Sequence, residues 1–435
     1  MSKNEEITLV ADVDDKISFS KAILLGFQHV LAMDLYIVPI ILASILAFTI
    51  GETSILIQAT FLSAGIATII QVSIGIKLPV VQGPSYIPIG ALASIGGSLG
   101  IPAMIGSLIP GAILITLLGY FKVVGRLIRR VVPPIVAGTV ILVIGIALMP
   151  VAMTNIFQGT DGSHGENLIV ATSSAVVLVV LLVIGSRVGK ALQIVKLTSV
   201  LVALIVGTII AMTFDMVDFS PILDAPWIAL PHLFGFGMPV FDLSAIVTMI
   251  FIYFVILIES TGTWFAVGTV IDEEITRERI DKGTAGEGLG LTTASLLGGL
   301  PVTGYSTNAG IIAVTGVASR QAILAAGGIL MLLGLVPKFT TLISVIPEVV
   351  IMGVFTIVTV IIAMNGLRII KHVKLTERNM LVIGIPILFV ISGIVMPEEV
   401  MNIFPEFIQY LISAGMAIGA LMAVLLNLVL KEDKK

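Results

Sequence analysis

The stretch 296-LLGGLPVTGYSTNAGIIAVTG-316 is rich in Gly, Thr, Ser and Pro, and it lies between Lys282 and Arg320. The residues between these two cations are too few for two membrane helices of roughly 20 residues each plus a turn. A similar piece, 79-PVVQGPSYIPIGALASIGGSLG-100, lies in the first half of the chain. Non-helical backbone at membrane depth persists only where protein buries it or where it lines a cavity. Two such interrupted segments therefore predict a ligand site between them, near the middle of the membrane.

The composition places the chain in a membrane. Hydrophobic residues make up 57% of its 435 residues and charged residues 11%, which leaves too little polar surface for a soluble protein of this length. The net charge of −4 is spread over loops and tails and favours no nucleic-acid or acidic partner. Because the chain has no cysteine, disulfides, thiolate chemistry and cysteine-based metal sites are excluded. The polar, acidic start MSKNEEITLVADVDDK lacks the order of a cleavable signal, so insertion by the chain's own helices is expected.

The basic residues predict the topology. Nearly all of the 23 Lys and Arg residues fall into groups separated by apolar spans, each long enough for one out-and-back hairpin. If each group is cytoplasmic, the chain has seven hairpins and about 14 crossings, with both termini cytoplasmic in a multi-pass plasma-membrane protein. The implied outer loops, 154–167, 215–242 and 397–406, contain no Lys or Arg. Lys338 is the one exception.

The two halves of the chain resemble each other. The piece 130-RVVPPIVAG-138 matches 345-VIPEVVIMG-353, and the two interrupted segments match as well. Since each half has an odd number of crossings, about seven, the two repeats must be inverted in the membrane. The predicted fold is an all-α integral membrane protein with two inverted seven-segment repeats and short, interrupted third and tenth segments.

Glu259 lies near the middle of the apolar run 242-DLSAIVTMIFIYFVILIESTGTWFAVGTVI-271. A carboxylate in hydrocarbon costs several kcal/mol unless it faces a cavity, a partner or a proton path. The residue is thus a functional candidate. The alternative is a neutral carboxyl group that a neighbouring hydroxyl binds, joining two helices.

Gln28 and His29 are adjacent polar residues in the apolar run 22-AILLGFQHVLAMDLYIVPIILASIL-46. They could hold a polar ligand or orient Glu259 by hydrogen bonding, or they could form a structural hydrogen bond between helices. Asp34, five residues on, points away from His29 on a helix and lines the path or lies near the outer mouth.

The two interrupted segments carry Ser85–Tyr86 and Thr307–Asn308. Unpaired backbone groups there would bind donors and acceptors on a flat heterocycle, while an aromatic ring stacks on its face. The half-helices that follow would direct positive dipole ends at the same place. The alternative is that the small residues simply allow close helix contact.

Further along the chain, Gly310 and Gly316 are predicted to pack closely, with Thr315 as a hydrogen-bonding group. Glu287 is expected near a cytoplasmic entry, as a surface carboxylate, a partner of a basic group or a proton-release group. The sequence has no Walker loop, no metal-binding His-Glu-x-x-His motif and no nucleophile–base pair at membrane depth. We therefore expect no enzyme activity, no metal and no cofactor. A channel is also disfavoured, because no continuous polar stripe runs along the spans.

Three motifs resemble the nucleobase–ascorbate transporters, also called the nucleobase:cation symporter-2 family. They are Gln28-His29, 259-ESTG-262 and 308-NAGIIAVTGVASR-320, and the likeness extends to 225-APWIALPHLFGFGMPVFDL-243. The resemblance implies core and gate domains, proton-coupled uptake of a small-molecule nucleobase, and a homodimer. Bicarbonate and sulfate transporters share this architecture without these motifs.

The resemblance also implies roles for individual residues. Glu259 would bind the edge of the nucleobase ring and Tyr86 its face, His29 would support coupling, and Asn308 would organise the tenth-span site. Glu287 would match the family's ninth-span carboxylate.

The chain departs from the family at two positions. The family usually has Gln or Glu where this chain has Thr307, and Asp or His where it has Thr263. Both replacements shorten a binding or coupling group to a hydroxyl. Gly316 and the residues up to Arg320 favour xanthine or uric acid, with a uracil permease and an anion transporter of the same architecture as alternatives.

The predicted domains follow from the hairpins and the resemblance. They are a cytoplasmic tail (1–19), the first half of the core (20–130), the first half of the gate (131–215), the second half of the core (216–342), the second half of the gate (343–430) and a cytoplasmic tail (431–435).

Overall fold

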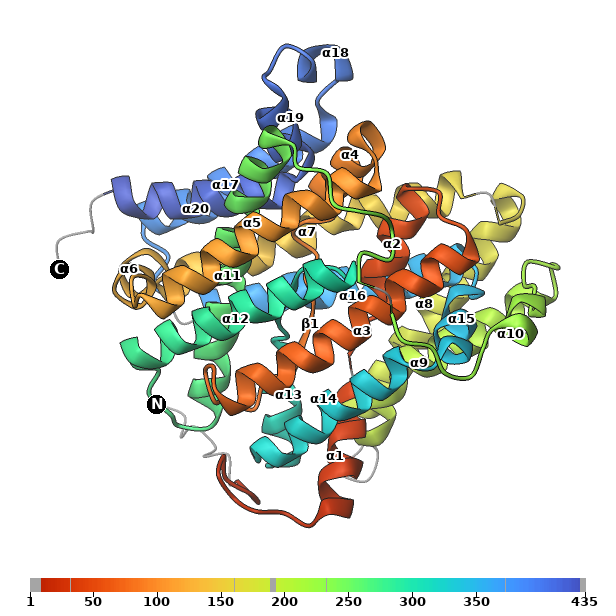
Figure 1. Ribbon diagram of the computed structural model, residues 1–435, viewed down its shortest axis with the longest axis horizontal. Helices are drawn as coiled ribbons and strands as arrows, with labels where there is room; N and C mark the ends of the chain where they lie inside the picture. The colour runs from red at the N-terminus through yellow and green to blue at the C-terminus, as the bar shows by residue number, and fades with distance from the viewer. Residues whose placement is uncertain are drawn as a thin grey trace.

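The computed structural model describes residues 9–31, 33–159, 161–187, 193–231, 233–371 and 373–430. The predictions for the tails thus fall partly outside the described residues, namely at 1–8 and 431–435. The described chain is helical, with one two-stranded sheet (Figure 1).

The first half of the chain contains ten helices and one strand. They are α1 (Phe19–Leu31), α2 (Ile37–Ile45), α3 (Ile50–Ser73), β1 (Gln82–Pro84), α4 (Ile89–Leu99), α5 (Ile101–Tyr120), α6 (Val124–Val131), α7 (Pro134–Gln158), α8 (His164–Arg187), α9 (Gln193–Met212) and α10 (Ser220–Asp224), counted over the described residues.

The second half repeats this plan with a second strand. Its elements are α11 (Leu243–Val270), α12 (Arg277–Leu297), β2 (Val302–Gly304), α13 (Thr307–Thr315), α14 (Arg320–Gly334), α15 (Pro337–Ser344), α16 (Glu348–Ile370), α17 (Glu377–Val395), α18 (Glu398–Met401), α19 (Glu406–Ser413) and α20 (Gly415–Val429).

Seven helices of the described chain are long and apolar enough to cross a membrane, and nine spans result if each of two bent helix pairs counts as one. Helix α12 is not among them; it carries Arg277, Asp281 and Glu287 among its 21 residues. The prediction of a multi-pass membrane protein is therefore confirmed, and the count of about 14 crossings remains a prediction.

Both segments that the sequence marks as interrupted contain non-helical backbone. Each holds a three-residue strand followed by a short helix, α4 of 11 residues and α13 of nine. The strands pair antiparallel, with Gln82 opposite Gly304 and Gly83 opposite Thr303. The segments are more than 200 residues apart in the chain, and the sequence did not predict that they pair with each other.

Each of the main helix pairs has a counterpart in which the corresponding helices of the two halves are exchanged. Helices α5, α12, α3 and α14 lie in a row (Figure 1), so that α5 packs on α12 as α14 packs on α3. Likewise α8 packs on α9 as α17 packs on α20, and α7 packs on α16. Two repeats related by a two-fold axis produce such pairs, so the pattern supports the predicted repeat.

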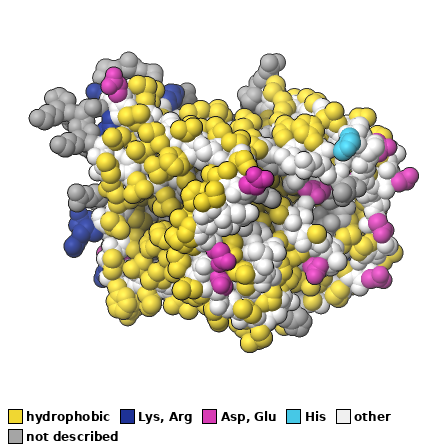
Figure 2. Space-filling view, turned by 90° about the horizontal axis from the view of Figure 1, so that it is seen from above, with side chains coloured by type: hydrophobic (Ala, Val, Ile, Leu, Met, Phe, Trp, Pro, Cys, Tyr) yellow, Lys and Arg dark blue, Asp and Glu magenta, His cyan; other side chains and the backbone are white. Residues whose placement is uncertain are grey.

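On one face of the molecule, most acidic residues lie away from the basic ones. Figure 2 shows Lys and Arg along the left edge of one face, while most Asp and Glu of that face lie further right. Lys338, the exception to the topology rule, donates hydrogen bonds to the backbone carbonyls of Ile222 and Leu223, at 2.8 and 3.2 Å, and lies 5.3 Å from the Trp227 ring centroid. These local partners explain a cation at this end of the molecule.

A cavity of about 260 Å³ lies between α2 and the start of α16. Three acidic side chains, Asp161, Asp218 and Glu348, are among its lining residues. Burial raises the pKa of the Asp161 carboxyl above its ordinary value, and hydrogen bonds from backbone N–H groups, including that of Val349 at 3.0 Å, oppose this rise.

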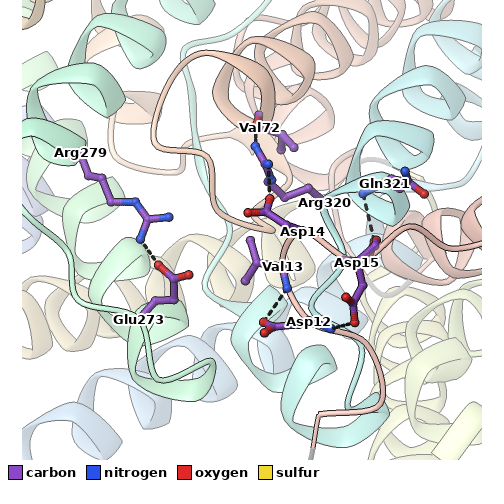
Figure 3. Close-up of polar contacts among 10 residues, drawn as sticks. Asp12, Val13, Asp14, Asp15, Val72, Glu273, Arg279, Arg320 and Gln321 are labelled. Atoms are coloured by element: carbon purple, nitrogen blue, oxygen red, sulfur yellow. Dashed lines mark hydrogen bonds and ion pairs between the residues drawn. The ribbon is translucent and has the colours of Figure 1, made fainter.

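The N-terminal segment 9–17 is bound to the link between α13 and α14. The backbone N–H of Val10 donates to Gly316 O at 2.6 Å, and Arg320 N–H donates to Val13 O at 3.0 Å. The Arg320 guanidinium pairs with Asp14 and also donates to Val72 O at the end of α3 (Figure 3). We call residues 9–17 the N-terminal strap.

Candidate functional site

The candidate site forms where β1 and β2 cross the middle of the helix bundle. Beyond the paired strands, Ser85 N–H donates to Pro301 O at 2.8 Å and Tyr305 N–H donates to Val81 O at 3.1 Å. The prediction that these segments offer unpaired backbone groups is therefore wrong for the groups that pair between the two segments. This pairing makes the side chains around the strands the further candidates for recognition.

The Glu259 carboxyl, half-buried on α11, lies against both strands. The Ser85 hydroxyl donates to Glu259 Oε2 at 2.9 Å, and the Thr303 hydroxyl lies beside the carboxyl. One hydroxyl follows β1 and the other lies in β2. The hydroxyl–carboxyl contact that the sequence left as the structural alternative is thus present, and it holds the carboxyl at the crossing.

Glu287 on α12 lies deeper, with 1% of its surface exposed. Gln71 Nε2 donates to its Oε2 at 2.6 Å, and Ser260 Oγ donates to its Oε1 at 2.5 Å. The alternatives of a surface carboxylate and of a partner for a basic group are therefore wrong. Its partners are neutral groups on α3 and α11.

His29 and Asn308 are brought together from opposite halves of the chain. His29 Nδ1 lies 3.0 Å from Asn308 Oδ1 in a buried hydrogen bond, and Asn308 Nδ2 donates to Tyr305 O at 2.7 Å. Gln28, next to His29 on α1, is half-buried. The hydrogen bond between helices that the sequence left as an alternative for His29 is present, and it fixes the start of α13.

Tyr86 is directed at two residues that the sequence did not link to it. Its hydroxyl donates to Asp34 Oδ2 at 2.5 Å, and its ring stacks on Phe355 of α16 with the centroids 5.6 Å apart and the planes at 18°. Asp34 therefore lies beside the first interrupted segment. The aromatic face expected to meet a ligand meets Phe355 in this conformation.

The two threonines that depart from the family pattern differ in their surroundings. Thr263 Oγ1 donates to Gly304 O at 2.9 Å, so its hydroxyl secures β2 to α11. Thr307 Oγ1, at the start of α13, is a buried atom without a hydrogen-bond partner. Thr307 thus offers a free hydroxyl, while that of Thr263 is already bound.

The three residues further along α13 have structural surroundings. The close packing predicted for Gly310 is wrong, because it is exposed and a Cβ there would meet no heavy atom within 4 Å. Thr315 donates to Ile311 O at 2.9 Å, within its own helix. Gly316 ends α13 with φ of +69°, a left-handed conformation that glycine adopts without strain.

Gln82 is a candidate that sequence reasoning missed. It is fully buried in β1, and neither Nε2 nor Oε1 of its amide has a hydrogen-bond partner. Buried amides are almost always satisfied, so an unpaired one needs an explanation. A Cβ built on Gly304 would lie 3.5 Å from Gln82 Nε2, which places the amide at the strand crossing. A glutamine between Val and Gly gives no sequence signal of this kind.

A site formed by two paired half-segments inside a bundle of membrane helices defines the class of transporters with discontinuous spans. Residues 20–399 match the family model described as "Permease family", and the chain belongs to this family, the nucleobase:cation symporter-2 family. It is accordingly a transporter and not an enzyme.

Several curated relatives are similar over nearly their whole length. The nucleobase transporter PlUacP of Paenibacillus larvae is 34% identical, covering 96% of this chain and 96% of its own. The uric acid permease PucK of Bacillus subtilis is 32% identical (93% and 94%), and the xanthine permease of the same organism 31% (94% and 94%).

Among solved structures, the transmembrane domain of the cyanobacterial bicarbonate transporter BicA superimposes with a TM-score of 0.65 at 15% identity, covering 92% of this chain and all of that one. This likeness concerns the fold alone.

Proposed function

We propose that this chain takes up a nucleobase, a purine such as xanthine or uric acid, together with protons. The names of the relatives support a nucleobase as the substrate class. The proposed carrier has 14 spans in two inverted repeats, works as a homodimer and keeps both termini in the cytoplasm.

One observation carries this proposal. At the strand crossing, the Glu259 carboxyl lies against Ser85, directly after β1, and Gln82 in β1 carries a buried, unpaired amide. The edge of a purine ring presents N–H and C=O groups side by side. An amide and a carboxyl group supply the complementary acceptors and donors, and they leave few of their own polar atoms unpaired once the base is bound.

The other candidate residues have proposed roles around the bound purine. Ser85, Thr263 and Asn308 orient the strands and α13, and Thr307 supplies a free hydroxyl. Tyr86 would cover the ring face. His29, Gln28, Glu287, Gly310, Thr315 and Gly316 form the proposed coupling and structural set.

Transport is proposed to follow alternating access. The core, residues 20–130 and 216–342, would shift against the gate, residues 131–215 and 343–430, and so carry the site from one side to the other. Since Tyr86 belongs to the core and Phe355 to the gate, the stacked pair lies at the boundary that must open. A proton taken up by Glu259 removes the cost of a buried charge as the base binds.

Two alternatives remain within this architecture. A uracil permease would use the same carboxyl and amide for a smaller ring. An anion carrier of the same architecture is the less favoured alternative, because the relatives reported above are nucleobase, uric acid and xanthine transporters.

The direct test is uptake of labelled xanthine, uric acid, uracil, guanine and adenine into cells that express the chain, with and without a protonophore. We expect accumulation of a purine that collapses with the protonophore. Uptake of uracil alone would replace the purine by a pyrimidine, and uptake of no base would refute a nucleobase carrier.

Glu259→Gln tests the role of the carboxyl group in the same assay. We expect accumulation to fall roughly a hundredfold, because proton transfer by a positioned side chain contributes at least that factor. Glu278→Gln is the matched control, since Glu278 is an exposed partner of Lys282 at the start of α12. If Glu259→Gln accumulated the base as wild type does, proton uptake by Glu259 would be wrong.

A further inference from the structure

A row of side-chain hydroxyls lies between the two carboxyl groups, Glu259 and Glu287. Ser260 Oγ lies 2.5 Å from Glu287 Oε1 and 2.8 Å from Thr303 Oγ1. The Thr303 hydroxyl in turn lies beside the Glu259 carboxyl. Two hydrogen bonds and this third, adjacent contact therefore lie between a half-buried carboxyl at the strand crossing and a fully buried one on α12.

The number of hydrogens that such a row of oxygen atoms needs follows from the groups that form it. A proton relay between the two carboxyls needs one hydrogen in each of the three oxygen–oxygen contacts, and the hydroxyls of Ser260 and Thr303 supply one each. The third must be a carboxyl proton. The row is thus complete only when Glu259 and Glu287 together hold one proton; with none, two oxygens face each other unbridged.

That one proton can lie at either end. With Glu259 protonated, Glu259 donates to Thr303, Thr303 to Ser260 and Ser260 to Glu287. With Glu287 protonated, all three donors reverse. Passing between the two patterns breaks one O–H bond and forms one at each step, with no atom or charge gained or lost, and moves the proton from Glu259 to Glu287.

The remaining carboxyl oxygens are fixed as acceptors. Gln71 Nε2 donates both of its hydrogens, one to Gly283 O at 2.9 Å and one to Glu287 Oε2, while Gln71 Oε1 accepts from Ile76 N–H at 3.1 Å. The amide therefore cannot rotate without losing a partner. It leaves Glu287 Oε1, the oxygen that faces Ser260, to hold the proton. Ser85 occupies Glu259 Oε2 in the same way.

Tyr305 is another titratable side chain that faces Glu259. Its hydroxyl donates to Pro84 O at 3.0 Å, so it lies outside this row. Asp34 and Tyr86 bond to each other, and His29 bonds to Asn308.

We propose that Thr303 and Ser260 form a proton relay from Glu259 to Glu287, with Gln71 as the positioning residue. The relay rests on the proposed proton-coupled uptake. It lets the binding-site carboxyl lose its proton to a buried acceptor without water entering the site.

The test separates proton-driven uptake from exchange, in which labelled base enters against unlabelled base with no net proton movement. Thr303→Val removes the hydroxyl at nearly constant volume. Thr261→Val is the matched control, because Thr261 is buried on the same helix as Ser260 and its hydroxyl donates to Leu257 O of that helix at 2.7 Å. Thr303→Ser restores the hydroxyl.

For Thr303→Val we expect net uptake driven by a pH gradient to fall roughly tenfold or more relative to exchange, with net uptake recovered in Thr303→Ser. Unchanged net uptake, or an equal fall in net uptake and exchange, would overturn the relay.

A readout without substrate keeps the relay separate from the proposed function. In infrared spectra of purified protein, the pH dependence of the protonated-carboxyl band should change in Thr303→Val and stay as in wild type in Thr261→Val. If the band titrates alike in both variants, the relay is refuted. If wild type moves no nucleobase while the band behaves as expected, the relay is supported and the substrate assignment fails.

Discussion

At the scale of single residues, a substitution of Gln82, whose amide is unpaired, should affect stability and function in different ways. A buried amide without partners costs about 1–3 kcal/mol relative to one that is satisfied. Gln82→Leu has a similar volume and removes that cost, so we expect a thermal unfolding temperature equal to or above that of wild type. The KM for the base should nevertheless rise roughly tenfold or more, because the base loses its two partners.

Thermal unfolding in detergent and uptake kinetics measure both effects. A variant with unchanged KM would show that the amide does not contact the substrate. A variant that unfolds well below wild type would show that Gln82 has a structural partner in the working protein.

Sequence reasoning can single out a residue where a polar group is isolated in an apolar run. Glu259 and His29 stand out in this way. In the structure, each forms a hydrogen bond with a residue from the other half of the chain, Glu259 with Ser85 and His29 with Asn308. Sequence reasoning could not identify Thr303 or Gln71, because hydroxyls and amides are common in membrane helices and their importance depends on partners far away in the chain. Thr303, for example, lies opposite Gly83 only because the two strands pair.

At the scale of elements, the pairing of β1 with β2 depends on Gly83. A Cβ at this position would lie 2.1 Å from Leu35 Cδ2 and 2.6 Å from Tyr305 Cε2. We expect Gly83→Ala to destabilise the protein by about 1–3 kcal/mol, as overpacking does, and to reduce uptake in parallel.

Gly97→Ala in α4 is the matched control for the strand pair. No heavy atom lies within 4 Å of a Cβ there, and alanine in a helix gains up to about 1 kcal/mol over glycine. The two variants should therefore shift the unfolding temperature in opposite directions. Equal shifts would mean that the close approach at Gly83 is not rigid.

The N-terminal strap gives a second prediction at this scale. The Asp14 side chain is 79% exposed, so its ion pair with Arg320 contributes at most about 1 kcal/mol. Arg320 also donates to the carbonyl of the buried Val72, and losing a buried hydrogen bond costs about 1–3 kcal/mol. Arg320→Ala should thus destabilise more than Asp14→Ala. Equal losses in thermal unfolding would show that the ion pair, not the bond to α3, holds the strap.

Elements were predicted well where the signal is local. Gly and Pro marked both interruptions, because they disfavour helix wherever they occur. The strands were missed, since three residues such as 302-VTG-304 carry no pattern without their partner. The strap was missed for the same reason: its acidic, polar residues predict a solvated tail, and only the fold shows the backbone of 316–320 beside it.

At the scale of the whole molecule, the proposed motion of core against gate can be blocked chemically. Ser44 on α2 and Glu348 at the start of α16 lie on opposite sides of the proposed boundary and line the same cavity. Since the chain has no cysteine, Ser44→Cys with Glu348→Cys introduces a single thiol pair. Its oxidation should reduce uptake roughly tenfold or more, because a locked carrier cannot complete its cycle, and a reductant should restore it.

Ser54→Cys with Thr340→Cys is the matched control for this lock. The two hydroxyls lie 2.8 Å apart, on α3 and α15, and both belong to the proposed core. A disulfide inside one rigid body should leave uptake nearly unchanged, whereas one between two moving bodies stops it. If the oxidised Ser44–Glu348 pair transported as fast as its reduced form, α2 and α16 would move together, and the boundary between core and gate would have to lie elsewhere in the bundle.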